Sequence, residues 1–196
     1  LHLSLRRQRQ MCIETDAAQI PFQQIDCVNW KDYPYTPDVR FRIAHTGDAI
    51  LIHYRVTEKS VRAVAPADNG RVWEDACAEF FVQPTDEKKY YNFECNCAGT
   101  LLIEYGIPGN REHALLETVG QVERWASLGR IPFEERLGEC SWQLALRIPV
   151  SAFFHDKIAL LDGKKMRANF YNAATNFKRP ISCLLYTSDA ADEGLG

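Results

Sequence analysis

The chain has 196 residues, 46% of them hydrophobic, so it can bury one large core and a single domain is expected. Its net charge of −3 leaves no basic surplus, which argues against nucleic acid or an anionic membrane as the main partner. No apolar run approaches the length of a membrane span, and none is predicted.

Alternating apolar and polar residues predict short strands separated by turns. In chain order these strands cover residues 39–43, 50–56, 77–83, 90–97, 101–105, 122–126, 142–148 and 166–171. The polar stretch 106–117 is expected to be a loop or a short helix. With almost no helix periodicity, the pattern predicts an all-β fold, an antiparallel two-sheet β-sandwich of the jelly-roll or immunoglobulin-like kind. The side chains expected between the sheets are Phe80, Val82, Phe93, Trp142, Leu144 and Leu146.

A tryptophan on a polar turn precedes the strand predicted at 77–83. Trp73 follows an Asp-Asn-Gly turn and has charged neighbours, so its indole has little apolar company within its own segment. Glu79 alternates with the apolar residues of the strand and should point away from the core, within reach of Trp73. A flat ring beside a fixed acceptor is a common way to hold a sugar. The alternative is a core tryptophan under a loop and a solvated glutamate.

The strand predicted at 90–97 repeats this pattern. Asn92, Glu94 and Asn96 lie on one side, and the aromatic and cysteine side chains on the other. If the two strands are neighbours, Glu79, Asn92 and Glu94 could line one polar face and supply the donors and acceptors that sugar hydroxyls need. The same pattern would also arise on the solvated face of an antiparallel sheet.

Further segments stand in a recognisable order on both sides of the Trp73 turn. They are Val61-Arg62-Ala63, Tyr90 to Thr100, Ser127-Leu128-Gly129-Arg130, Ser141-Trp142 and Met166 to Tyr171. With the turn, they resemble the family 9 carbohydrate-binding modules and their relatives among the DOMON-like β-sandwiches, in particular a bacterial single-domain subgroup. The resemblance covers about residues 18–182, taken here as the carbohydrate-binding domain.

This resemblance implies non-catalytic binding of the ends of mono- or oligosaccharides in support of polysaccharide breakdown, with no cofactor. Trp73 and Glu79 match the positions that contact the sugar, and Asn92 is the nearest counterpart of a polar contact on the next strand. The basic residue of the family has no obvious counterpart in the pattern, and neither has the second aromatic ring, which comes from near the C-terminus. Such proteins are often exported, and the location of this one stays open.

Two other functions are compatible with the residues. Some DOMON-like sandwiches bind haem through a methionine and a histidine, which would use Met166, although no histidine is marked as its partner. A glycoside hydrolase would need two carboxylates across the scissile bond, for which Glu79 and Glu94 are the candidates. The seven cysteines and five histidines show no metal-binding spacing, so reduced thiols and no metal are expected.

Both ends of the chain are expected to be non-native. Residues 1–10 precede the first methionine and contain no apolar segment of a secretion signal, so they are interpreted as upstream read-through. Residues 183–196 resemble the translation of a transposase adapter used in sequencing-library preparation. The natural protein is therefore expected to continue beyond Ser182 with a further strand and an aromatic residue for the sugar.

Overall fold

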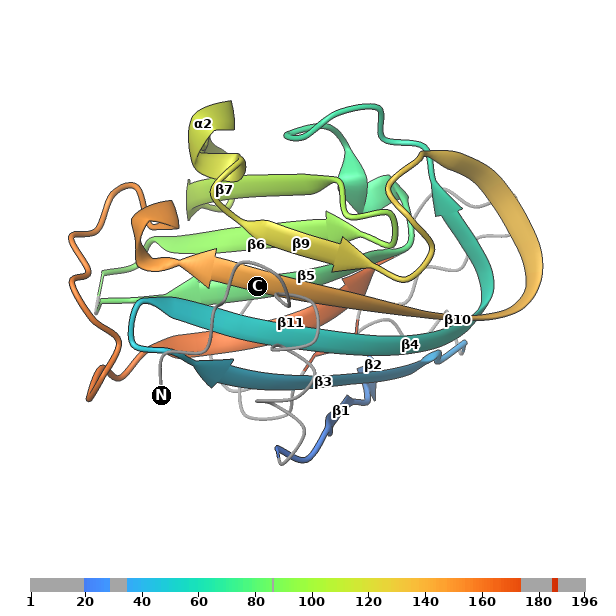
Figure 1. Cartoon of the computed structure of the whole chain (residues 1–196), viewed down its shortest axis with the longest axis horizontal. Coiled ribbons are helices and arrows are strands. Elements are labelled where there is room, and N and C mark those ends of the chain that lie inside the picture. The colour runs from blue at the N-terminus through green and yellow to red at the C-terminus, as the bar shows by residue number, and fades with distance from the viewer. Residues whose placement is uncertain (1–19, 29–34, 86, 174–184, 187–196) are drawn as a thin grey trace, which may run out of the picture.

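The computed structural model describes residues 20–28, 35–85, 87–173 and 185–186. Two antiparallel sheets lie one over the other (Figure 1). The first, called here the β4 sheet, has the order β1-β3-β4-β10-β9, and the second, called the β6 sheet, has the order β2-β12-β11-β5-β6-β7-β8. The predicted two-sheet antiparallel β-sandwich is confirmed.

Each sheet is assembled from strands that are distant in the chain. The β4 sheet contains β1 (Gln23–Ile25), β3 (Asp38–His45), β4 (Ala49–Ala63), β9 (Glu123–Ala126) and β10 (Phe133–Pro149). The β6 sheet contains β2 (Cys27–Val28), β5 (Cys77–Gln83), β6 (Tyr90–Asn96), β7 (Leu101–Ile107), β8 (Asn110–His113), β11 (Arg167–Ala173) and β12 (Leu185–Tyr186). The helical turns are η1 (Val72–Glu74), α2 (Leu116–Val119) and η2 (Val150–Ala152).

The core lies between the two sheets. The six side chains predicted there are all buried. Phe41 of β3 stacks on Phe170 of β11 with ring centroids 3.7 Å apart, and Phe80 of β5 lies 5.1 Å from the same ring. Aromatic contacts therefore join the two sheets across the middle of the sandwich, beyond what area burial alone contributes.

Two strands are longer than the alternation predicts. β4 continues to Ala63, and β10 begins at Phe133 and pairs with it through two register shifts. The added part of β10 is largely exposed on both faces. Because a strand without a buried face needs no apolar period, its sequence carries no alternation to detect.

The predicted ends of the chain fall mainly outside the described residues. Residues 1–10, and 183–196 apart from 185–186, are not described. The two-residue strand β12 pairs with β2 and with Asn172 of β11.

No described helix is long and apolar enough to cross a membrane. In the described part of the chain, no group of three or more His, Cys, Asp or Glu side chains is placed to hold a metal ion.

A buried carboxyl group lies beside the core. The indole Nε1 of Trp142 donates a 2.6 Å hydrogen bond to Oε1 of Glu58, which is 3% exposed. Burial raises the pKa of Glu58 to about 7, against the lowering effect of that hydrogen bond. The folded protein therefore holds this proton at a pH where the unfolded chain has released it.

This carboxyl group should make stability fall as the pH rises. The contribution of Glu58 is complete below its ordinary pKa and is lost as the pH passes through the raised value, so unfolding should become easier by about 1 kcal/mol or more between about pH 5 and about pH 8. Urea denaturation across that range measures the slope. Glu58→Gln keeps an acceptor for Trp142 but cannot ionise, and its slope should be shallower; an unchanged slope would remove Glu58 as a cause.

Candidate functional site

The outer face of the β6 sheet carries an ordered set of polar side chains. β5 pairs with β6, which sets Glu79 opposite Glu94 and Phe81 opposite Asn92. β6 pairs with β7, which sets Asn92 opposite Glu104. We call Glu79, Asn92, Glu94 and Glu104 the polar face. The condition set by the sequence, that these two strands are neighbours, is therefore met.

The polar face is largely withdrawn from solvent. Glu79 is 4% exposed, Glu94 8% and Asn92 0%. A merely solvated sheet surface would leave such side chains open to water. Burying carboxylates and an amide is costly unless their acceptors and donors are satisfied, so their hydrogen bonds decide what this face can do.

The side-chain amide of Asn92 donates both of its hydrogen bonds within the polar face, and two acceptor atoms of the face remain without a donor among the described residues. Its Nδ2 donates to Oε1 of Glu94 at 2.6 Å and to Oε2 of Glu104 at 3.1 Å. Among the described residues, Oδ1 of Asn92 and Oε2 of Glu94 are buried without a hydrogen-bond partner. Buried orphan acceptors are uncommon in folded proteins. These two atoms are therefore acceptors that the described part of the protein leaves without a donor.

Arg111 of β8 is a basic residue of this face that the sequence pattern did not reveal. Its guanidinium Cζ lies 4.6 Å from the ring centroid of Tyr90, whose hydroxyl it also contacts, and 5.8 Å from that of Phe81. Its Nη1 lies 3.8 Å from Oε2 of Glu104. It was missed because 106–117 was expected to be a loop or short helix, whereas the first part of that stretch is a hairpin that ends in β8.

The carboxyl groups of the polar face resist ionisation. Burial raises the pKa of Glu79 well above its usual value, the charge of Glu94 adds to this, and Arg111 opposes it. Burial also raises the pKa of Glu94 to about 7, with the hydrogen bond from Asn92 and the charge of Arg111 opposing. Near neutral pH the pair therefore holds a proton that exposed carboxyl groups would have lost.

Trp73 lies at one end of the polar face. It belongs to η1 and is half-buried, packed against a small apolar cluster that includes Cys77 and Leu102. Cys77 lies two residues before Glu79 on β5, and Leu102 is the cross-strand partner of Glu94. The indole therefore packs against residues that neighbour Glu79 and Glu94 on the sheet. The guanidinium of Arg71 lies 5.9 Å from its ring centroid.

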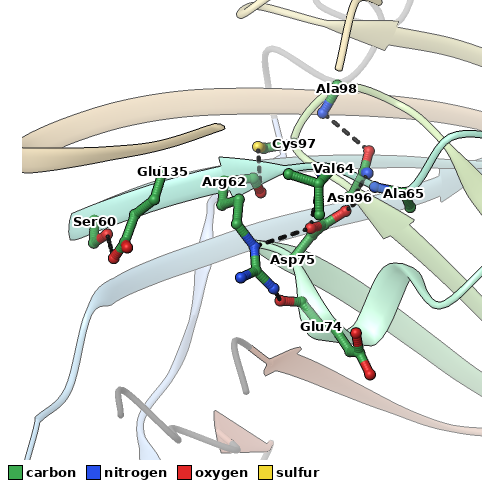
Figure 2. A network of polar contacts seen from close by, with 10 residues as sticks. All are labelled: Ser60, Arg62, Val64, Ala65, Glu74, Asp75, Asn96, Cys97, Ala98 and Glu135. Atoms are coloured by element: carbon green, nitrogen blue, oxygen red, sulfur yellow. Dashed lines mark hydrogen bonds and ion pairs between the residues drawn. The ribbon is translucent and has the colours of Figure 1, made fainter. Parts of the chain in front are cut away.

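Asp75 fixes the turn that carries Trp73 (Figure 2). This fully buried carboxylate accepts from the backbone N–H of Val64 at 3.0 Å, from that of Ala65 at 3.0 Å, and from Nδ2 of Asn96 at 2.9 Å. Nε of Arg62 lies 3.4 Å away, and the same guanidinium donates to the carbonyl oxygen of Glu74. The network ties η1 to the end of β4 and to the end of β6.

The predicted site residues thus lie together. Trp73, Glu79 and Asn92 border or belong to one face, joined by Glu94, Glu104 and Arg111. Met166, considered as a haem ligand, packs against the hydrophobic core. Glu79 and Glu94 are direct cross-strand partners on one sheet surface, whereas a hydrolase needs its carboxylates on either side of the scissile bond.

Comparisons with known proteins give a consistent picture. The sequence model of a family described as carbohydrate-binding family 9 matches residues 9–187. Among solved structures, a candidate carbohydrate-binding protein from Bacteroides uniformis shares 59% identity and a TM-score of 0.83, over 87% of this chain and 78% of that one. No curated protein matches the chain.

Two structures of a family 9 carbohydrate-binding module from Caldicellulosiruptor kristjanssonii share the fold. The complex with glucose has 9% identity and a TM-score of 0.52, over 90% of this chain and 80% of that one. The complex with cellotriose has 10% identity and a TM-score of 0.54, over 91% and 80%. At this identity the likeness is one of fold.

Proposed function

Because the chain belongs to carbohydrate-binding family 9, we propose that its polar face binds the end of a mono- or oligosaccharide. The sequence resemblance indicated this family, and carbohydrate binding without catalysis is the function that follows from it. The domain proposed to do this covers about residues 18–182.

The observation that carries the proposal is the pair of orphan acceptors. Oδ1 of Asn92 and Oε2 of Glu94 are buried and lack donors among the described residues. Sugar hydroxyl groups are donors that come in closely spaced sets, so one sugar ring can satisfy both atoms. The carboxyl group of Glu79 on β5 lies opposite Glu94 of β6. In this proposal it accepts a hydrogen bond from a third hydroxyl group of the sugar.

Trp73 provides the apolar contact. An aromatic ring covers the C–H face of a sugar while hydroxyl groups at the ring edge reach polar side chains. Because η1 comes before β5, a longer sugar chain is proposed to extend from Trp73 along β5 toward Phe81 and Tyr90.

Glu79→Gln should weaken sugar binding about tenfold. The substitution keeps the size of the side chain but replaces one carboxyl oxygen by an amide NH2 group, which cannot accept a hydrogen bond. A sugar hydroxyl group buried without its acceptor costs about 1 kcal/mol or more. Calorimetric titration with glucose and with cellotriose measures the effect. Glu139→Gln, an exposed position on β10, is the matched control and should bind like the unmodified protein. Equal affinity in both variants would exclude Glu79 from the site.

A further inference from the structure

We propose that the polar face prefers a sugar with a free amino group, a hexosamine, over the neutral sugar of the same stereochemistry. This inference rests on the carbohydrate-binding function proposed above. It concerns the charge of the ligand, which that function leaves open.

The basic side chains of the face contact Glu104. Nε2 of His113 lies 2.9 Å from Oε1 of Glu104, and Nη1 of Arg111 lies 3.8 Å from Oε2 of the same residue. Among the described residues no cationic side chain forms an ion pair with Glu79 or Glu94, and Arg111 acts on them only from a distance. The buried Glu79–Glu94 pair therefore lacks a counter-charge in contact with it.

Neighbouring side chains in the described part of the chain also supply no further donor to the pair. Both hydrogens of the Asn92 amide group are used, on Glu94 and on Glu104. This fixes the orientation of the amide and leaves its Oδ1 as an acceptor beside the unpartnered Oε2 of Glu94. The ligand that completes the face must bring several donors to neighbouring acceptors.

An ammonium group meets both needs. It carries three N–H donors and a positive charge, whereas a hydroxyl group carries one donor and no charge. A charge placed against two buried carboxyl groups removes the like-charge repulsion that keeps them from ionising together. A divalent metal ion is the weaker alternative, because no group of three or more ligating side chains is placed to hold one in the described part of the chain.

Binding of the ammonium form should also release a proton. The pKa of Glu94 is raised to about 7 in the empty face, so near neutral pH part of the protein holds a proton on the pair. The cation favours the ionised carboxylates, and the displaced proton passes to the buffer. A neutral sugar supplies no charge to drive this release.

The experiment uses matched pairs of sugars. The protein is titrated calorimetrically near neutral pH with glucose, galactose and mannose, with the three corresponding 2-amino sugars, and with N-acetylglucosamine, which keeps the nitrogen but has no charge. At least one amino sugar should bind about tenfold or more tightly than its neutral partner, as for a charge-assisted hydrogen bond. N-acetylglucosamine should show no such gain.

Glu94→Gln identifies the cause. Removing one carboxyl group should lower the ratio of amino-sugar to neutral-sugar affinity to about one, while Glu139→Gln should keep the ratio of the unmodified protein. If the Glu94 variant does not fold, the inference is tested on the unmodified protein alone. The two measurements are then the ratio of amino-sugar to neutral-sugar affinity and the proton release, obtained in two buffers of different ionisation enthalpy.

The outcomes separate the two proposals. Neutral sugars that bind as tightly as their amino partners would overturn the hexosamine inference and leave carbohydrate binding at this face intact. A preference that survives in Glu94→Gln would overturn the role of the carboxyl pair. If folded protein bound none of these sugars, the binding site proposed above would fail as well.

Discussion

Trp73→Ala should lower sugar affinity by about 2 kcal/mol or more, roughly thirtyfold, and leave the fold intact. Central aromatic anchors carry losses of this size when truncated. The indole is half-buried and packs against a small apolar cluster that is separate from the main core. The turn that carries it is held mainly by the buried carboxylate of Asp75 rather than by the ring.

Trp125→Ala is the matched control. Trp125 lies on β9 and packs with Leu51 and Ala145, on the outer face of the β4 sheet. This variant should bind sugar like the unmodified protein. Calorimetry gives the affinities, and urea denaturation shows whether each variant is folded. A Trp73→Ala protein that unfolds, or that binds sugar normally, would make Trp73 a structural residue only.

Asp75→Ala should lower the free energy of unfolding by about 3 kcal/mol or more. The substitution leaves two backbone N–H groups and the amide of Asn96 without their acceptor in a fully buried place. It also strips the guanidinium of Arg62 of a nearby buried charge, and breaking such a pair is strongly destabilising.

Asp75→Asn provides a graded comparison. It keeps one acceptor oxygen and should cost less than the alanine variant. Asp38→Ala is the exposed control, since its ion pair with Arg40 lies at the surface and should be worth less than about 1 kcal/mol. Urea denaturation measures all three variants. An Asp75→Ala protein as stable as the Asp38→Ala protein would show that the network does not hold the turn.

The alternation of apolar and polar residues predicted most of the sandwich, because side chains along a strand with one buried face alternate between core and solvent. This was enough to place Phe80, Phe93 and Trp142 in the core and to set Glu79 on the outer side. The pairing of β5 with β6 was left open by the alternation and comes from the structure.

The pattern failed where polar residues are buried. Asp75 and Glu58 are as enclosed as core residues, but their partners lie elsewhere in the chain. Asp75 is held by backbone groups of β4 and by Asn96, and Glu58 by Trp142. The alternation pattern did not identify Arg111 because its strand, β8, is short and polar throughout. Such sites depend on which distant segments meet, and a local period carries no information on that.

The central claim is that sugar binds on the outer face of the β6 sheet beside Trp73. Amide shift mapping by nuclear magnetic resonance, on labelled protein titrated with the tightest-binding sugar, tests it most directly. The largest shifts should fall on η1, β5 and β6 and on the side-chain amide of Asn92. Shifts gathered instead around Arg42 and His53, which are buried in the β4 sheet, or no shifts at saturating sugar, would contradict it.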